Sequence, residues 1–200
     1  AQTMSRAMAI VARWQRAYPL HSGLRLSLKV TARQLSDDQF VDHVHTAVKH
    51  SGIVASSVML EISEGVLLPG NALTAERLAQ LTAIGMTVYI DDWGEGWSSL
   101  RHLDALHVSG LKLTDSFVAE LPSQRQTGMA RAVLDLAGSL GMEAVIPTSL
   151  ATLEQRDVLV DLGYRLGQGD LLGTVMGAGE AEDTLVAMAP APWPSVAHLH

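Results

Sequence analysis

Apolar and polar positions follow two different periods along this chain, and the two periods alternate. Every second residue from Leu24 to Val30 is leucine or valine, which predicts a strand. Apolar residues spaced three and four apart in Ser5 to Ala17 predict a helix. The strand pattern returns over residues 58–62, 86–91, 110–113, 144–147 and 164–168. The helix pattern returns over residues 36–50, 71–84, 98–106, 123–140, from 152 onward, and over 181–188.

Strands that alternate with helices predict a parallel sheet covered by helices. Six predicted strands in 200 residues fall short of a closed (β/α)8 barrel, which has eight strands and typically about 250 residues. An open doubly wound sheet is the alternative, but its usual glycine-rich phosphate turn does not follow Val30. The periodicity alone therefore leaves two α/β architectures.

Composition narrows the class of protein. The chain has no cysteine, which excludes a disulfide framework, a zinc ribbon and a thiol nucleophile. The net charge of −7 argues against binding to DNA or RNA polymers through charge. No apolar run approaches the roughly 20 residues of a membrane span, and the N-terminus lacks a signal-peptide pattern. We therefore expect a cytoplasmic location, no membrane span in this chain and no nucleic-acid partner.

Polar residues gather where the predicted strands end. They are Lys29, Glu61, Asp91, Asp92, Lys112, Thr148 and Gln168. In a (β/α)8 barrel these strand ends converge on one mouth, where such enzymes do chemistry. Carboxylate oxygens are the ligands that hard divalent cations prefer, and adjacent aspartates can serve two metals roughly 4 Å apart, as in phosphodiester cleavage. The candidate metal ligands are Glu61, Asp91 and Asp92.

A simpler interpretation exists for each of these residues. A single carboxylate at a strand end is often a helix cap, and a single lysine is often a surface charge. The adjacent pair Asp91–Asp92 is harder to explain in this way, because consecutive strand residues face opposite sides and one must point inward. Burying an unpartnered carboxylate is costly, so the pair favours a functional site. The eight histidines form no metal-binding pattern.

The segment from Tyr89 to Leu100, YIDDWGEGWSSL, resembles the DDFGTGYSSL loop of EAL domains. Further blocks in the family's order resemble its other motifs: LEISE at 60–64, LKLTDSFV at 111–118, SLKVTARQL at 27–35 and QG at 168–169. The resemblance implies a TIM-like (β/α)8 barrel, incomplete at its N-terminus because the signature EAL strand is missing. It implies an EAL-like barrel domain over residues 1–188, followed by a proline-rich tail over 189–200. It also implies descent from enzymes that linearise cyclic di-GMP with two Mg²⁺ or Mn²⁺ ions.

Several positions depart from the motifs of this family. Lys29 stands where the family has a metal-binding asparagine, and an ammonium group cannot ligate a cation. Thr114 replaces an aspartate, and Thr148 replaces the glutamate that acts as general base. A threonine hydroxyl has no useful basicity near neutral pH. Lys112 is retained. These departures predict a degenerate phosphodiesterase that is not an enzyme, with no intact catalytic set.

The expected function is therefore that of a catalytically inactive regulatory domain in cyclic di-GMP signalling. It would act as a nucleotide receptor or as a protein-interaction module beside other signalling domains. The alternative is an active cyclic di-GMP-specific phosphodiesterase that uses two divalent metals. The candidate ligand-binding residues are Lys29, Glu61, Asp91, Asp92, Lys112 and Gln168. No cofactor is expected, except Mg²⁺ or Mn²⁺ if the three carboxylates still bind metal.

Two further expectations concern charge and assembly. Lys29 is expected to replace the metal's positive charge by pairing with Glu61 or Asp91, although it could also simply point to solvent. Trp93 and Trp97 are candidate anchors of a homodimer interface, because the resemblance places them in a loop that forms the dimer surface in this family and tryptophan is enriched in interface hot spots. The alternative is that both tryptophans pack inside their own barrel.

Overall fold

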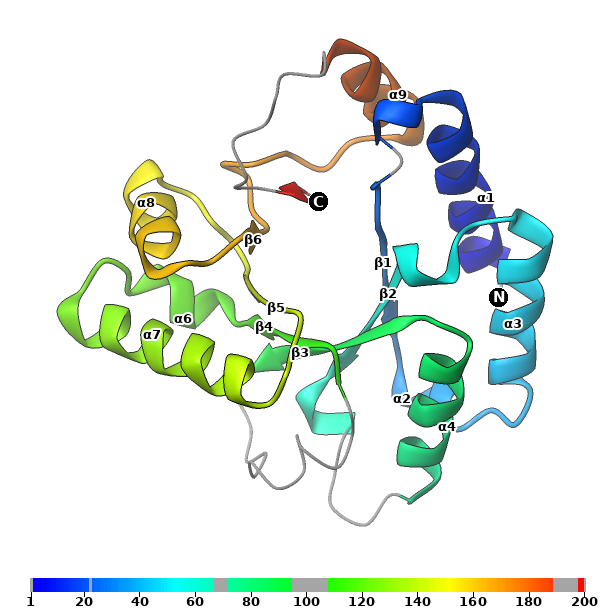
Figure 1. Cartoon of the computed structure of the whole chain (residues 1–200), viewed down its shortest axis with the longest axis horizontal. Helices are drawn as coiled ribbons and strands as arrows, with labels where there is room; N and C mark the ends of the chain where they lie inside the picture. The colour runs from blue at the N-terminus through cyan, green and yellow to red at the C-terminus, as the bar shows by residue number, and fades with distance from the viewer. Residues whose placement is uncertain (1, 22, 67–71, 95–107, 189–197, 200) are drawn as a thin grey trace. The chain divides into compact units, whose positions relative to one another are not determined.

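The fold was analysed in a computed structural model, which describes residues 2–21, 23–66, 72–94, 108–188 and 198–199 (Figure 1). The main helices are α1 (Gln2–Ala17), α2 (Ala32–Leu35), α3 (Phe40–Ser51), α4 (Ala72–Ala83), α6 (Asp115–Ala119), α7 (Gln124–Ser139), α8 (Leu153–Leu162) and α9 (Ala178–Ala187). The strands are β1 (Leu26–Val30), β2 (Val58–Ser63), β3 (Thr87–Trp93), β4 (Gly110–Leu113), β5 (Ala144–Pro147), β6 (Leu166–Gly167) and β7 (His198–Leu199).

Five of the strands form one sheet in chain order, β1-β2-β3-β4-β5. The pairs β3–β4 and β4–β5 are parallel, with Gly110 opposite both Tyr89 and Ala144. Strands β6 and β7 form a separate parallel pair. A parallel sheet whose strands are joined through helices is the α/β arrangement expected from the sequence, and its carboxyl ends lie along one edge.

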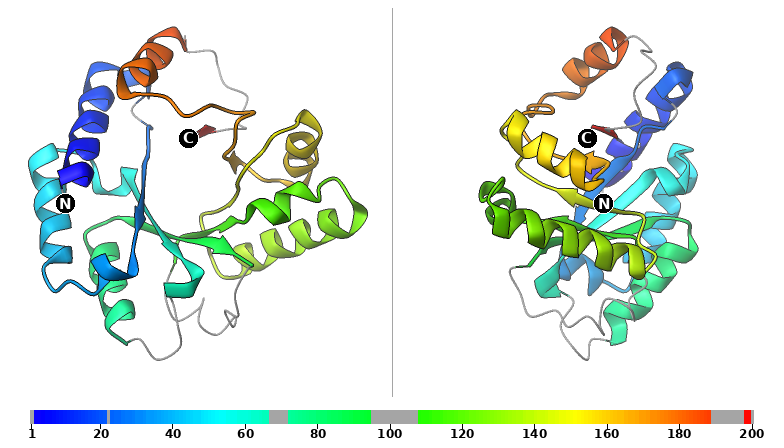
Figure 2. Two further views of the ribbon diagram at one scale, coloured as in Figure 1. Left: turned by 180° about the vertical axis from the view of Figure 1, so that it is seen from behind. Right: turned by 60° about the vertical axis from the view of Figure 1, so that its left-hand side comes forward.

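The contacts divide the chain into two compact units. The first comprises residues 1–61, 70–88 and 176–193. In it, α1 packs along α3, and both views of Figure 2 show these two helices side by side. Met8 of α1 and Val44 of α3 are completely buried. Trp14 of α1 is 8% exposed, and its Nε1 is buried with no hydrogen-bond partner among the described residues.

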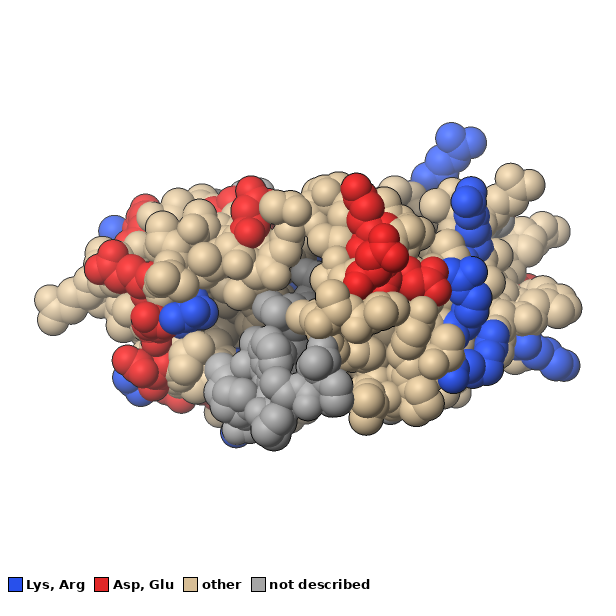
Figure 3. All heavy atoms as spheres, turned by 90° about the horizontal axis from the view of Figure 1, so that it is seen from above, with Lys and Arg blue, Asp and Glu red and all other residues tan. Residues whose placement is uncertain are grey.

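Charged side chains fasten α9 to α1 within the same unit. Arg13 forms an ion pair with Glu182 at 2.6 Å, and the Tyr18 hydroxyl donates to the same carboxylate at 3.2 Å. Figure 3 shows a group of acidic side chains beside a row of basic ones on the face seen there. This charge separation fits a helix, α1, that carries three arginines and no acidic residue.

The second unit comprises residues 62–69, 89–175 and 194–200. Helices α7 and α8 contact each other, and α7 lies on β5. Side-chain amides support this layer from inside: Gln126 donates to the Phe117 carbonyl at 2.8 Å, and Gln155 donates to the Val118 carbonyl at 3.1 Å. The buried Tyr164 hydroxyl donates to the Ala130 carbonyl at 2.8 Å. These bonds fix the helices that follow β4 and β5.

Most of the expected elements are present, with two errors. Ser36 was expected to begin a helix reaching residue 50, but it ends the short helix α2, and Gln39 precedes α3. The reason is a capping box at Thr31: the Thr31 N–H donates to the side-chain oxygen of Gln34, and the Gln34 N–H donates to the Thr31 hydroxyl oxygen, which starts a separate turn. Helix α6 was not predicted, because its five residues are too few to show a period.

Other expectations lie outside the described residues. The helix expected over 98–106 falls there, as does most of the tail. The boundary between a barrel domain over residues 1–188 and a tail over 189–200 therefore stays a prediction. None of the described helices combines the length and apolar character that a membrane crossing requires.

Candidate active site at the carboxyl ends of the strands

The clearest pair of polar groups at the strand ends joins β3 and β4. Lys112 Nζ lies 3.7 Å from Asp91 Oδ1. Both residues are buried, with exposed fractions of 4% and 6%. Buried charges require compensation, and each of these two groups compensates the other. The structure thus brings together two of the residues that the sequence singled out.

The register of β3 and β4 explains this juxtaposition. Tyr89 lies opposite Gly110 and Ile90 opposite Leu111, and the pairing then shifts so that Asp91 and Asp92 together span the position of Lys112. A Cβ atom on Gly110 would lie 2.4 Å from Tyr89 Cε1 and 2.3 Å from the Ala144 carbonyl oxygen. Glycine at position 110 therefore allows the Tyr89 ring to lie against β4, one layer below the charged pair.

Strand β3 is irregular where its two aspartates lie. Its pairing with β4 shifts between Ile90 and Trp93, and Asp92 has a φ of 57°. A non-glycine residue in this left-handed region is uncommon, and such positions concentrate at functional sites. Asp91 is buried and Asp92 is half-buried. The shift in register thus gives the two carboxylates different surroundings.

Glu64 supports the chain that follows β3, and the sequence analysis did not select it. Its carboxylate is 7% exposed, and its Oε2 accepts a hydrogen bond from the Gly94 backbone N–H at 3.1 Å. The available signal was its place as the second glutamate of the LEISE block. A buried carboxylate bonded to backbone N–H stabilises a turn that lacks regular hydrogen bonds.

At the ends of β1 and β2, Glu61 is buried and accepts a hydrogen bond from the Ser27 hydroxyl. Ser27 and Lys29 are two residues apart on β1 and so face the same side, the side of Glu61. Lys29 is exposed. Its expected pairing with Glu61 or Asp91 stays a prediction. Ser27 was missed because serine in an alternating strand is indistinguishable from an ordinary solvent-facing residue.

Thr148 follows β5 and is held by its neighbours on β4 and α6. Its hydroxyl oxygen lies 2.6 Å from the Leu113 carbonyl oxygen and 3.0 Å from Asp115 Oδ1. The Ser149 hydroxyl donates to the same Asp115 oxygen at 2.5 Å. The hydrogen bond from Ser149 lowers the pKa of Asp115 most, and the hydrogen bond from Thr148 and the charge of Lys112 lower it further. Partial desolvation raises this pKa but is outweighed. Sequence analysis passed over Asp115, because Thr114 occupied the position compared with the family.

Gln168 follows β6, and its side chain is exposed. Its backbone binds the end of β5: Gln168 N–H donates to the Pro147 carbonyl, and Leu150 N–H donates to the Gln168 carbonyl, both at 2.9 Å. The next residue, Gly169, has a φ of 151°, and a Cβ there would lie 2.1 Å from the Leu150 nitrogen. The Gln168–Gly169 pair thus lets two backbones approach closely.

The tryptophans expected at a dimer interface are only partly described. Trp93 ends β3 and is half-buried, whereas Trp97 lies outside the described residues. Their role as interface anchors stays a prediction.

The described residues do not fit a bound metal ion in this arrangement. No three histidine, cysteine, aspartate or glutamate side chains among them are grouped as a metal site would require. The Asp91 carboxylate is turned to the Lys112 ammonium, and the Glu61 carboxylate accepts the Ser27 hydroxyl. Each of these carboxylates therefore already has a protein partner. Metal binding by Glu61, Asp91 and Asp92 is a prediction, and no step below depends on it.

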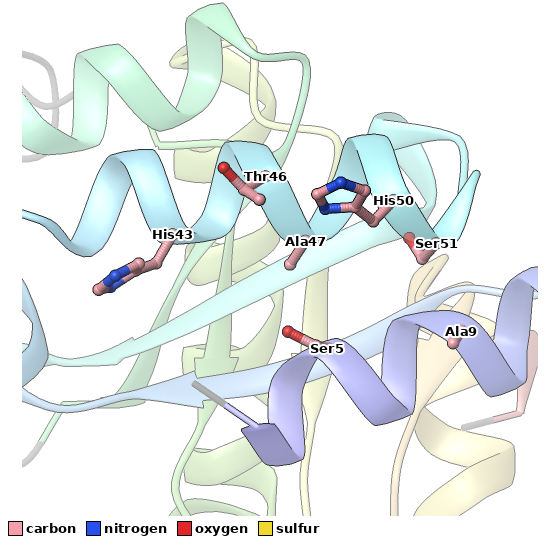
Figure 4. Close-up of a pocket in the computed structure, with 7 residues that line it drawn as sticks. All are labelled: Ser5, Ala9, His43, Thr46, Ala47, His50 and Ser51. Atoms are coloured by element: carbon pink, nitrogen blue, oxygen red, sulfur yellow. The ribbon is translucent and has the colours of Figure 1, made fainter.

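A separate pocket of about 300 Å³ lies between α1 and α3 (Figure 4). Ser5 and Ala9 line it from α1; His43, Thr46, Ala47, His50 and Ser51 line it from α3. His43 and His50 are seven residues apart on one helix, so their rings lie two turns, or about 10 Å, apart along the helix axis. They cannot ligate one ion together. This pocket lies between helices and contains none of the residues expected at the strand ends.

Comparison with known families gives the context of this site. The sequence profile of the EAL domain matches residues 1–174. The chain belongs to the EAL domain family. Among curated relatives, it is 31% identical over 168 residues to the cyclic di-GMP phosphodiesterase NbdA of Pseudomonas aeruginosa and 31% identical over 181 residues to the cyclic di-GMP phosphodiesterase PA2567 of the same organism. These matches cover 84% and 90% of this chain but only 21% and 30% of the relatives' length.

Solved EAL structures share the fold. The EAL domain of Mycobacterium smegmatis DcpA is 34% identical, with a TM-score of 0.84 over 92% of this chain and 82% of that one. The MucR phosphodiesterase in complex with cyclic di-GMP is 27% identical, with a TM-score of 0.82 over 89% of this chain and 71% of that one. The TIM-like α/β fold expected from the sequence is therefore confirmed.

These relatives correct one expectation. The sequence analysis predicted that this EAL domain is not an enzyme, because Thr148 and Lys29 replace motif residues. That prediction is wrong: relatives at 31% identity are named phosphodiesterases, and a structural neighbour is a phosphodiesterase with cyclic di-GMP. The physical error was to equate a substitution at one position with the loss of a reaction. Proton transfer requires a suitably placed group, and that group can come from another residue.

Proposed function

We propose that this EAL domain binds cyclic di-GMP at the carboxyl ends of its strands and hydrolyses one of its phosphodiester bonds. The observation that carries the proposal is the buried Asp91–Lys112 pair at the end of β3 and β4, in a fold shared with named cyclic di-GMP phosphodiesterases. Burying a lysine at a strand end is costly, and cores of parallel sheets are normally apolar there. A catalytic site is the usual reason for such an exception.

The chemistry of the pair suits an anionic phosphodiester. Hydrolysis adds negative charge to the non-bridging oxygens in the transition state, and the Lys112 ammonium supplies a fixed positive charge at that position. Asp91 orients the ammonium, since its carboxylate lies 3.7 Å away. Little water reaches either group, and electrostatic interactions are stronger in such surroundings.

The proposal extends to the whole protein only through its relatives. The chain spans about a fifth to a third of the two curated relatives' length, at 21% and 30%. Contacts with other signalling domains, a homodimer and the cytoplasmic location expected from the sequence accompany this proposal as predictions.

The test is an assay of the purified protein with cyclic di-GMP in the presence of Mg²⁺ or Mn²⁺, with chromatographic separation of the linear product. We expect turnover by the wild type and a kcat about 100-fold lower in Lys112→Met. Arg125→Met, which removes an exposed cation at the start of α7, is the matched control and should leave kcat unchanged. Absence of linear product from the wild type would reject the proposal, as would full activity of Lys112→Met.

A further inference from the structure

Asp115 is the exposed carboxylate nearest in sequence to the end of β4, and its position is fixed from β5. Leu113, the last residue of β4, pairs with Pro147, the last residue of β5. Asp115 lies two residues after Leu113, and Thr148 and Ser149 directly follow Pro147. The hydroxyls of both residues lie within hydrogen-bond distance of Asp115 Oδ1, at 3.0 and 2.5 Å. One carboxylate, at the start of α6, is thus held by the two residues that follow β5.

The backbone of Ser149 is strained in this arrangement. Ser149 has a φ of 54°, the left-handed region that disfavours any residue with a Cβ. Such a conformation persists where the surroundings enforce it, and it is frequent at functional sites. Glycine would adopt it without strain, but glycine lacks the hydroxyl that donates to Asp115. Ser149 therefore keeps an unfavourable backbone conformation at a position where its hydroxyl donates to Asp115.

The geometry leaves one carboxylate oxygen available. Both hydroxyls approach Oδ1, and among the described residues no side chain donates to Oδ2. Asp115 is exposed, so Oδ2 is accessible to water. The Thr148 hydroxyl carries a single proton, and its shorter contact is with the Leu113 carbonyl at 2.6 Å. A neutral hydroxyl such as that of Thr148 is too weak a base to take a proton from water near neutral pH, whereas the carboxylate beside it can accept one.

We propose that Asp115 is a catalytic residue of this domain and accepts the proton of the water that attacks the phosphorus. The inference rests on the proposed phosphodiesterase function. The water oxygen forms the new bond to phosphorus as one ester P–O bond breaks, and the released proton passes to Asp115 Oδ2. Asp115 then returns that proton, through solvent, to the departing alkoxide. The products are a phosphomonoester and an alcohol, and no oxidant or reductant is consumed.

The electrostatic surroundings keep the Asp115 carboxylate ionised, which is the form that can accept a proton. Lys112 interacts with Asp115 as well as with Asp91, so one cation links the buried pair to the exposed carboxylate. Lys112 can therefore face the phosphate while Asp115 faces the attacking water. Position 115 thus adds a group that the motif comparison did not assign.

The decisive variant is Asp115→Asn, which keeps the shape and the acceptor oxygen but cannot take the proton. We expect its kcat to fall about 100-fold, with KM within about twofold of wild type, because general-base catalysis typically contributes 10²–10⁴-fold. Asp161→Asn removes an exposed carboxylate from α8 and should change neither parameter. Melting temperatures of all variants, measured alongside, separate a loss of catalysis from a loss of folding.

A second variant tests the position of the proton acceptor directly. In Asp115→Asn combined with Thr148→Glu, the new carboxylate starts from a position whose side chain already contacts residue 115. We expect kcat to recover at least tenfold over Asp115→Asn alone. Thr148→Glu in the wild-type background is the reference, because a carboxylate at position 148 could raise kcat by itself, and a gain there as large as in the double variant would overturn the role of Asp115.

The outcomes distinguish the two proposals. A wild type that binds cyclic di-GMP but does not cleave it would reject the phosphodiesterase function itself. An active wild type with an equally active Asp115→Asn would reject only the role of Asp115. A variant that loses affinity or melting temperature while keeping kcat would also overturn that role, because it would show a binding or structural contribution instead.

Discussion

Two buried cations, Arg77 in the first unit and Lys112 in the second, have nearly the same exposed fraction, 5% and 4%. Arg77 lies on α4 and donates to the carbonyls of Leu35 and Asp37, where α2 ends and the next loop begins. Lys112 lies on β4 and faces the carboxylate of Asp91. The first joins helices through backbone acceptors, whereas the second is placed with an acid at a strand end.

The comparison shows that burial of a charge does not by itself indicate function. Backbone carbonyls are present in any protein loop, and an arginine with its rigid fork of donors satisfies several of them at once. The lysine is a point charge whose partner is another titratable group at the edge where parallel strands end. Arg77 also has an acidic neighbour, Asp38, but that carboxylate is exposed, whereas the Asp91 carboxylate beside Lys112 is buried. A buried acid at a strand end, and not the burial of the cation itself, separates the candidate catalytic cation from the structural one.

The largest expected effect concerns the structural cation. Arg77→Leu should lower the free energy of unfolding by about 3 kcal/mol, because it removes the side-chain donor to the Leu35 carbonyl and one of the two donors to the Asp37 carbonyl, which keeps only the Phe40 N–H. Urea unfolding followed by circular dichroism measures this. Asp38→Ala, which removes only the exposed carboxylate of the same cluster, should cost at most about 0.5 kcal/mol. Equal losses in the two variants would contradict the interpretation of Arg77 as a backbone anchor.

The second effect concerns the strand that carries Lys112. Gly110→Ala should destabilise the protein by about 2 kcal/mol, because its Cβ would clash with the Ala144 carbonyl and the Tyr89 ring. Gly128→Ala, in the middle of α7 with open space around its position, should instead stabilise by up to about 1 kcal/mol. Thermal denaturation of both variants tests the close approach of β3 and β4. A neutral Gly110→Ala would mean that Tyr89 can move without cost.

The third effect is the coupling between Asp91 and Lys112. A double-mutant cycle of Asp91→Asn and Lys112→Met should give a coupling of about 1–2 kcal/mol in unfolding free energy, because each single variant leaves one buried group without its partner. The double variant should be more stable than the sum of the single losses predicts. Strict additivity would show that the two side chains do not interact in solution.

The smallest effect is the pH dependence of Asp115. Its pKa is lower in the folded protein than the ordinary value of 3.8, so its hydrogen bonds stabilise the fold above that value. That contribution is lost as the pH falls through the lowered pKa. Asp115→Asn should therefore lose less stability than the wild type on acidification below about pH 4, in melting curves taken at successive pH values. A parallel decline in both proteins would contradict the lowered pKa.

The order of elements could be predicted from sequence because each strand has its own apolar period. Strands β4 and β5 were predicted with the bounds that the structure shows. The start of α3 was not, because Ser36 looks like an N-cap while the local capping box at Thr31 uses it to end the preceding turn. Helix boundaries set by a few side-chain hydrogen bonds leave no periodic signal.

The residues of the candidate site also separate into those that could be predicted from the sequence and those that could not. Asp91 and Lys112 could be selected because charged residues are out of place in apolar strands. Asp115 and Ser149 could not, because the first turn of a helix and a loop are places where polar residues are expected, and their significance comes from a contact between residues more than 30 positions apart in sequence. The left-handed backbone conformation of Ser149 could likewise not be predicted, because serine does not favour it.

The fluorescence of Trp14 can be used to follow the packing of the first unit. Its N–H is shielded from water and unbonded within the described part of the chain, so its emission should lie at shorter wavelength than that of a hydrated tryptophan. Loosening of α1 from α3 would let water reach the ring and shift the emission to the red. With the other three tryptophans, Trp93, Trp97 and Trp193, replaced by phenylalanine, α1 therefore reports on its own attachment through intrinsic fluorescence, without a label.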